Sequence, residues 1–502
     1  MMWVMMLPVL LPMFTGALLL LFSQARLRWK RRINTVASLS LVPLAIWAVM
    51  VADQGISVVA LGNWMPPFGI VLVLDRFSAM MLLITAVLAV PAGLSMDYGL
   101  DRRGQNFQAL FQFQLMGLNG AFLTGDLFNL FVFFEILLIA SYALMVHSLG
   151  RERLAAGLHY VIVNLVGSVL FLVAAGLIYG LTGTLNLADL ALRLQQLPAN
   201  DIPLAKAAGA LLLMVFALKA AVLPIGMWLP ATYAAASAPI AALFAIMTKV
   251  GVYAIVRVHS LWFGEGADAF AGFGQAVIGG VGVVTLLVAS VGVLGARRLQ
   301  EMLAWLALVS VGTMLSVWAF ASPQATTAML YYLLHSTWIG GAMFLVCGVI
   351  AQQRGQLADA LTSGPQPAGT WLALSFLMGA VALAGLPPLS GFVGKVLILQ
   401  TANDGFEAIF FWLGLIGSGA AALIAFTRAG TTLFWRSDAT PQTPRLEQRQ
   451  PFGPVLMLLP FSVLLAVFAE PVLVFLQAAS ADLHTPQVYI DAVMGLSTRG
   501  QS

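Results

Sequence analysis

Residues 384–395 read AGLPPLSGFVGK, in which the adjacent prolines Pro387 and Pro388 are flanked by glycines and followed by a lysine. The stretch lies inside an apolar segment, 370–400, that is long enough to cross a bilayer. Proline removes a backbone donor and clashes with the preceding turn, so a helix through this segment has to break. At membrane depth the freed carbonyls must be satisfied by protein or water. The sequence therefore predicts a discontinuous transmembrane helix.

A second proline-rich stretch interrupts another apolar segment. Residues 223–240 read LPIGMWLPATYAAASAPI and contain Pro224, Pro230 and Pro239. They follow the apolar segment 204–228, which lies five predicted helices before 370–400. Two broken helices in corresponding positions are typical of transporters built from inverted repeats, and they indicate where the transport pathway runs.

The composition assigns the whole chain to the membrane. Of 502 residues, 61% are hydrophobic and 9% are charged, whereas a soluble domain has about 25% charged residues. Apolar runs long enough to span a bilayer recur throughout, so we expect an all-α polytopic membrane protein with about 14 transmembrane helices. The predicted windows are 2–22, 33–53, 70–96, 105–124, 127–149, 156–180, 204–228, 239–260, 275–295, 301–321, 326–351, 370–400, 407–434 and 453–478.

The helices group into five predicted sections. Residues 1–104 hold three N-terminal helices, 105–260 the first five-helix repeat, and 275–435 an inverted second repeat. One further helix, 453–478, precedes a tail, 479–502, that we expect to be a loosely ordered extension. Between helices, the polar segment 181–201 carries leucines at the spacing of a short surface helix.

The distribution of basic residues predicts the orientation. With the N-terminus outside, alternate loops are cytoplasmic and collect fifteen of the 24 lysines and arginines, which fits the positive-inside rule with both termini on the outer (periplasmic) side of a bacterial inner membrane. These fifteen are Arg26, Arg28, Lys30, Arg31, Arg32, Arg102, Arg103, Arg151, Arg153, Arg297, Arg298, Arg354, Arg436, Arg445 and Arg449.

Several classes of site are not expected. The net charge of +4 comes from loop residues, and no phosphate-binding glycine loop or aromatic–basic interleaving suggests a nucleic-acid partner. The single cysteine, Cys347, excludes an internal disulfide and a cysteine-based metal site. No His/Glu spacing indicates a catalytic metal, and no nucleophile–base pair stands out. We therefore expect a transporter subunit without cofactors rather than an enzyme.

Five ionisable residues lie deep inside the apolar windows: Glu135, Lys219, Lys249, His335 and Lys395. A charge at the bilayer centre costs about 2.5–3.5 kcal/mol on insertion scales, and such residues mark proton and ion pathways. One acid cannot neutralise three ionised lysines, and burial disfavours the charged form. At least one lysine is then neutral for part of a cycle and can accept and release protons. The pattern favours a proton relay over the alternative of structural ion pairs.

Other polar groups have simpler interpretations. His335 could bond a neighbouring hydroxyl, Ser336 or Thr337, instead of taking part in a relay. Asp75 and Arg76 lie where a helix leaves the membrane and could pair with another loop. Asp126 is expected to cap the helix that begins at residue 127.

The same segments resemble a known family. LKAAVLPIGMWLP, AIMTKVGVYAI, GLPPLSGFVGK and FFEILLIASYAL are similar to the proton-translocating antiporter-like family, which includes the large subunits of Mrp-type monovalent cation/proton antiporters and the membrane-arm subunits of respiratory complex I. Further stretches, among them FQLMGLNGAFLTGDLFNLFVFFE and YYLLHSTWIGGAMFLV, resemble the D-type subunits of Mrp (Pha) antiporters. The resemblance covers nearly the whole chain.

The resemblance implies a role for each matching position. Glu135 corresponds to the family's glutamate that pairs with a lysine of the first broken helix, here Lys219. Lys249 corresponds to the connecting lysine, His335 falls in a histidine motif, and Lys395 matches the ionisable residue of the second broken helix. The implied partners are the other subunits of a hetero-oligomeric complex, the lipid bilayer, protons and monovalent cations.

Two departures from the complex I relatives are visible. Those relatives usually have a histidine in the first break, where this chain reads PIGMWLP, and AYSS…H where this chain reads AWLALVSVG with Ser310. The sequence thus predicts a proton-translocating subunit of a Na⁺ or K⁺/proton antiporter. Two alternatives stay open: an antiporter-like subunit of a redox-driven complex (complex I or a membrane-bound hydrogenase), and a purely structural membrane scaffold.

Overall fold

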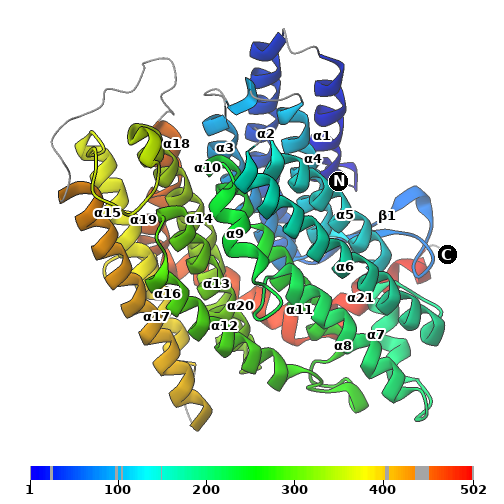
Figure 1. The fold of residues 1–502 in the computed structure, drawn as a ribbon. Coiled ribbons are helices and arrows are strands. Elements are labelled where there is room, and N and C mark those ends of the chain that lie inside the picture. The colour runs from blue at the N-terminus through cyan, green and yellow to red at the C-terminus, as the bar shows by residue number, and fades with distance from the viewer. Residues whose placement is uncertain are drawn as a thin grey trace.

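The fold is a bundle of long helices (Figure 1). The computed structural model describes residues 2–22, 26–96, 100–102, 106–147, 150–401, 406–435 and 452–499. Arg103, Arg436, Arg445 and Arg449 lie outside these ranges. The helices are α1 (Met2–Leu21), α2 (Leu27–Gln54), α3 (Arg76–Met96), α4 (Phe107–Leu123), α5 (Leu127–Val146), α6 (Arg151–Thr182), α7 (Leu187–Gln195), α8 (Ile202–Lys219), α9 (Trp228–Ala235), α10 (Ala238–Phe244), α11 (Met247–Trp262), α12 (Gln275–Gly295), α13 (Leu299–Trp318), α14 (Pro323–Gln353), α15 (Thr370–Ala384), α16 (Ser390–Leu399), α17 (Phe406–Gly430), α18 (Gly453–Leu458), α19 (Pro460–Val467), α20 (Ala469–His484) and α21 (Pro486–Arg499).

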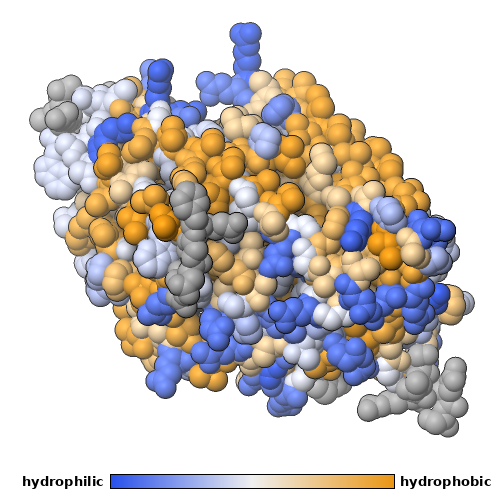
Figure 2. Space-filling model, turned by 90° about the horizontal axis from the view of Figure 1, so that it is seen from below, coloured by the Kyte–Doolittle hydropathy of each residue, from blue (hydrophilic) through white to orange (hydrophobic). Residues whose placement is uncertain are grey.

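The all-α polytopic membrane fold is confirmed. Among the described residues, 11 helices are long and apolar enough to cross a membrane, or 12 when the bent pair formed by 453–467 and 469–484 is one span. The remaining predicted spans are α4, which has 17 residues, and the broken pair α15 and α16. Hydrophobic residues cover much of the face seen in Figure 2. The division into sections at residues 104, 260, 275 and 435 stays a prediction, as does the side of the membrane on which the termini lie.

Both predicted breaks are present, but their bounds differ in detail from those predicted from the sequence. The first span ends at Lys219, nine residues before the predicted end at 228, and α9 begins only at Trp228. Pro224 lies in this gap, whereas Pro230 is the third residue of α9. Pro239 is the second residue of α10 and starts that helix rather than breaking one, because a first-turn proline lacks only a donor that would be unpaired anyway. In the second break, Pro387 and Pro388 lie between α15 and α16.

A β-hairpin takes the place of the predicted start of a helix at residue 70. Strands β1 (Ser57–Ala60) and β2 (Val71–Leu74) pair antiparallel, and α3 begins only at Arg76. A short apolar run such as VLVL cannot be assigned to helix or strand by periodicity alone. A hydrogen bond attaches the hairpin to the segment between α4 and α5, since the Gly125 amide donates to the Val71 carbonyl at 2.9 Å.

The C-terminal tail is helical, so the prediction of a loosely ordered extension is wrong for its described residues. Helix α21 packs against α7 and β1, and it buries Tyr489, Ile490 and Val493. This burial supplies the stabilisation that an isolated helix of its length lacks in water. The predicted surface helix is present as α7, whose leucines 187, 190 and 194 are buried against the protein.

Candidate functional site

The first charged cluster joins α5, α6 and α8 through a serine. The hydroxyl of Ser168 donates to Oε1 of Glu135. Nζ of Lys219 donates to Oγ of Ser168 at 3.4 Å and to the Asn164 carbonyl at 3.3 Å. Glu135 and Lys219 therefore interact through Ser168 rather than through a direct salt bridge. Because a hydroxyl can both donate and accept, Ser168 can carry a proton between the two.

Lys219 lies at the end of a helix where a positive charge is favoured. It is the last residue of α8, and the unpaired carbonyls of a helix C-terminus carry a partial negative charge. Its side chain is buried, with 8% of the residue exposed. The carbonyls of the last turn of α8 are themselves paired with the amides of residues 220–222, and Nζ of Lys219 bonds α6 instead.

Close packing of α11 holds this helix end in position. A Cβ on Gly251 would lie 2.3 Å from the Ala220 nitrogen, so only glycine allows α11 to approach the residue that follows Lys219. The same helix carries Lys249 two residues earlier, which places the two lysines on adjoining segments.

We expect Gly251→Ala to lower the stability of the protein by about 1–3 kcal/mol, because the added methyl group forces the end of α8 and Lys219 to move. The measurement is the thermal midpoint of the purified protein. Gly180→Ala on α6 is the matched control, since a Cβ there meets nothing within 4 Å. Equal midpoints for both variants would contradict the positioning role.

Lys249 is buried between α11 and α13. Only 1% of the residue is exposed, and its Nζ donates to Oγ of Ser310 at 2.7 Å and to Oγ1 of Thr248 at 3.3 Å. Ser310 is the hydroxyl in the segment that departs from the complex I pattern. No carboxylate among the described residues lies within salt-bridge distance of this lysine.

Lys249 and Lys395 line one internal cavity. It has a volume of about 30 Å³, and its polar lining consists of Lys249, Ser310, Tyr332, Ser336, Lys395 and Ser418. A cavity needs about 10–15 Å³ to admit a water molecule that has polar partners, so there is room for one or two. Water in this cavity would connect the two lysines by hydrogen bonds.

Lys395 lies at the second break, on α16, and bonds across it. Its Nζ donates at 2.8 Å to the carbonyl of Ala384, the last residue of α15. The ammonium therefore interacts with the negative end of an interrupted helix. Each broken helix holds one lysine at the break.

His335 is buried but bonds a different partner from those expected. Its Nδ1 lies 2.7 Å from Oγ of Ser390 at the start of α16, and Ser390 in turn lies 3.0 Å from Oγ of Ser462. The hydroxyls of Ser336 and Thr337 both donate to the Leu333 carbonyl instead, because a serine or threonine in a helix readily bonds a carbonyl one turn earlier. The structure thus brings His335 to the second break, away from the cavity between the lysines.

A buried ion pair that the sequence did not indicate lies at one end of the bundle. Nη1 of Arg257 is 2.6 Å from Oδ2 of Asp75, with side chains only 6% and 4% exposed. The guanidinium also packs 5.2–5.4 Å from the ring centres of three aromatic residues, Phe77, Tyr253 and Tyr489. The sequence suggests no partner for Arg257, since nothing local connects residues that are 182 positions apart.

Asp75 and Arg76 do form ion pairs, but with residues of helices rather than with another loop. Arg76 forms salt bridges with Asp53 of α2 and Asp482 of α20, at 3.2 and 2.9 Å. The prediction for Asp126 is confirmed, since it caps α5 by accepting a hydrogen bond from the Asn129 amide. Within the described residues no cluster of three or more His, Cys, Asp or Glu side chains could hold a metal ion.

Comparison with known proteins identifies the family. The family model described as NADH:quinone oxidoreductase/Mrp antiporter, transmembrane region, matches residues 124–423. The chain is 38% identical to the D-type subunit of a probable K⁺/H⁺ antiporter of Rhizobium meliloti, over 98% of each chain. The chain belongs to the family of D-type Mrp antiporter subunits. It is also 34% identical to the D-type subunit of a Na⁺/H⁺ antiporter of Bacillus subtilis, over 97% of this chain and 98% of that protein.

Solved structures give the same assignment of fold. A chain of the Mrp complex from a Dietzia species superposes with a TM-score of 0.87 at 27% identity, covering 98% of this chain and 100% of that one. A chain of respiratory complex I from Thermus thermophilus superposes with a TM-score of 0.76 at 25% identity, covering 96% and 99%. Both are multisubunit assemblies, and this chain is likewise a subunit of a hetero-oligomeric membrane complex.

Proposed function

We propose that this chain moves protons within a multisubunit antiporter of the bacterial inner membrane that exchanges protons for Na⁺ or K⁺. The observation that carries the proposal is the shared cavity of Lys249 and Lys395, which supports proton transfer between α11 and the second broken helix. The names of the relatives, which specify K⁺/H⁺ and Na⁺/H⁺ antiporters, support the exchanged ions.

The proposed relay has two ends. At one end, Lys219 accepts a proton, and Glu135 stabilises its charged form through Ser168. At the other end, Lys249 gives its proton to cavity water and Lys395 takes one from it, so the number of protons in the cavity is unchanged. His335 acts beside this row through Ser390, by fixing the start of α16 that carries Lys395. Making and breaking the Glu135–Ser168–Lys219 connection would couple proton movement to the cation pathway elsewhere in the complex.

The proposal is tested with Glu135→Ala, Lys219→Ala and Lys395→Ala in the intact complex. Each substitution removes one end of the relay, and we expect cation-driven proton movement in everted vesicles to fall at least tenfold. Lys206→Ala is the control, because Lys206 lies outside the relay and packs over the rings of Phe270 and Phe273 at 5.8 and 5.7 Å. Normal antiport in all three relay variants would overturn the proposal.

A further inference from the structure

A second polar cavity lies at the end of α11 beyond the relay. It has a volume of about 120 Å³, enough for several waters. Its lining includes His259 and Ser260 of α11, Trp318 of α13, His484 of α20, and Glu265 and Gln275 nearby. None of these residues belongs to the relay described above.

Two residues that line this cavity each have a buried polar atom without a protein partner. Nε2 of His259 and Nε1 of Trp318 form no hydrogen bond with any described residue, although each residue is only 4% exposed. The Trp318 ring contacts both imidazoles, with centres 5.8 Å from His259 and 5.9 Å from His484. A buried polar group without a partner costs free energy. Both side chains line a cavity with room for water, which suits polar groups that lack protein partners.

The separation between the cavity and the relay is similar when it is measured along α11 and along α13. Along α11, His259 follows Lys249 by ten residues, or about 15 Å of helix. Along α13, Trp318 follows Ser310 by eight residues, or about 12 Å. Helices α11 and α13 therefore contribute to both sites: the hydrogen-bonded pair Lys249 and Ser310 lies deeper in the bundle, and the cavity lies nearer to the ends of the two helices.

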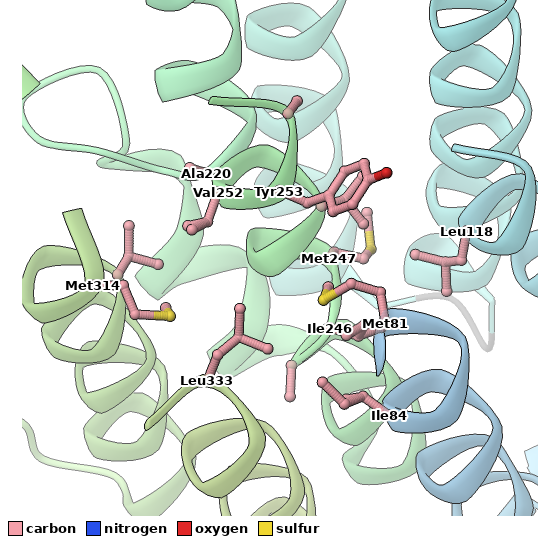
Figure 3. Packing of buried hydrophobic residues seen from close by; sticks show 14 of the residues in the cluster. Met81, Ile84, Leu118, Ala220, Ile246, Met247, Val252, Tyr253, Met314 and Leu333 are labelled. Atoms are coloured by element: carbon pink, nitrogen blue, oxygen red, sulfur yellow. The ribbon is translucent and has the colours of Figure 1, made fainter. Parts of the chain in front are cut away.

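An apolar layer separates the two sites. Val252, Met314 and Leu333 are fully buried, and they come from α11, α13 and α14. Each lies two to four residues from Lys249, Ser310 or His335, respectively, on the side of the cavity. Figure 3 shows their side chains pointing into the same space between the three helices. Apolar side chains hold no hydrogen-bonded water, so this layer interrupts a proton path.

We propose that this cavity is the aqueous mouth of the proton pathway on the outer side, and that Val252, Met314 and Leu333 form the seal that closes it from Lys249 and Ser310 in this conformation. The inference rests on the proposed proton relay and on the predicted orientation, in which α11 ends at the outer surface. Opening of the seal connects the cavity water to Lys249.

Access to the cavity can be measured with cysteine. In the intact complex carrying Cys347→Ala, Ser260→Cys introduces a thiol of nearly the same shape into the cavity lining. A small, membrane-impermeant cationic methanethiosulfonate should modify it at least tenfold faster in spheroplasts than in everted vesicles, and modification should reduce antiport. The control, Ser336→Cys, lies in the inner cavity beside Lys395 and should not react from the outer side. Absence of modification at Ser260→Cys, or modification of both thiols alike, would overturn the proposal.

The seal has a test of its own. Met314→Ala shortens one of its three side chains, so vesicles should lose an imposed pH gradient at least threefold faster without added cation. Leu345→Ala, which shortens a buried side chain elsewhere on α14, should leave the leak unchanged. Identical leaks would overturn the assignment of the seal. If instead the relay variants keep normal antiport while Ser260→Cys stays accessible from outside, the relay fails and the cavity remains a hydrated outer vestibule.

Discussion

Lys249→Met should abolish antiport while leaving the complex at least as stable to heat as the parent. Lys249 is 1% exposed, and its ammonium bonds two hydroxyls, those of Ser310 and Thr248. A buried ion costs several kcal/mol of desolvation, and no carboxylate of the described residues lies close enough to offset this cost. Methionine has a similar length and no charge. The substitution therefore removes both the transferable proton and the cost of burying its carrier.

Opposite changes in activity and stability separate a functional lysine from a structural one. Loss of a structural lysine would lower the abundance and the melting temperature of the complex, whereas functional sites often cost stability. The measurements are ΔpH formation in vesicles and the thermal midpoint of the purified complex, with Lys206→Met as the surface control. Retained antiport would refute the relay role of Lys249, and a lower midpoint with lost assembly would assign it a structural one.

The sequence was informative wherever a local feature carries a large cost. Prolines inside an apolar segment and lysines at membrane depth each require a compensating structure, so both breaks and the buried ionisable residues could be predicted from the sequence alone. The structure then showed what compensates them. Lys395 bonds the carbonyl freed at the end of α15, and Lys219 is the residue at which α8 stops.

Contacts between segments that are far apart in the chain could not be predicted from the sequence. Ser168 lies on a helix whose pattern is simply apolar, and nothing local marks it as the link between Glu135 and Lys219. The partner of His335 is Ser390, 55 residues away, rather than a neighbour. The helical tail α21 could not be predicted for the same reason, because its polar sequence becomes helical through packing on α7 and β1. Tertiary contacts decided each of these cases.

Arg257→Met should strongly destabilise the protein, because it breaks the buried ion pair between Asp75 and Arg257. We expect this pair to contribute to stability rather than to transport. Arg257→Met leaves the Asp75 carboxylate buried at 4% exposure without its cation, and breaking a buried pair in this way costs about 3–5 kcal/mol. Burial by itself raises the pKa of Asp75, but Arg257 and Ser78 outweigh this effect and hold the pKa below its ordinary value. The pair is therefore intact at neutral pH, and its contribution is lost only as the pH falls through that lowered pKa.

A double substitution distinguishes the ion pair from simple packing. Asp75→Leu together with Arg257→Met removes both charges, so we expect the thermal midpoint of the complex to recover most of what Arg257→Met loses. Arg193→Ala is the control: the Arg193 side chain is 47% exposed in its salt bridge with Asp189, so solvent screens this pair and its loss should cost less than that of Arg257. If the double variant were no more stable than Arg257→Met, the loss would come from the contacts of Arg257 with Phe77, Tyr253 and Tyr489, and the charge pair would not be what stabilises this end of the bundle.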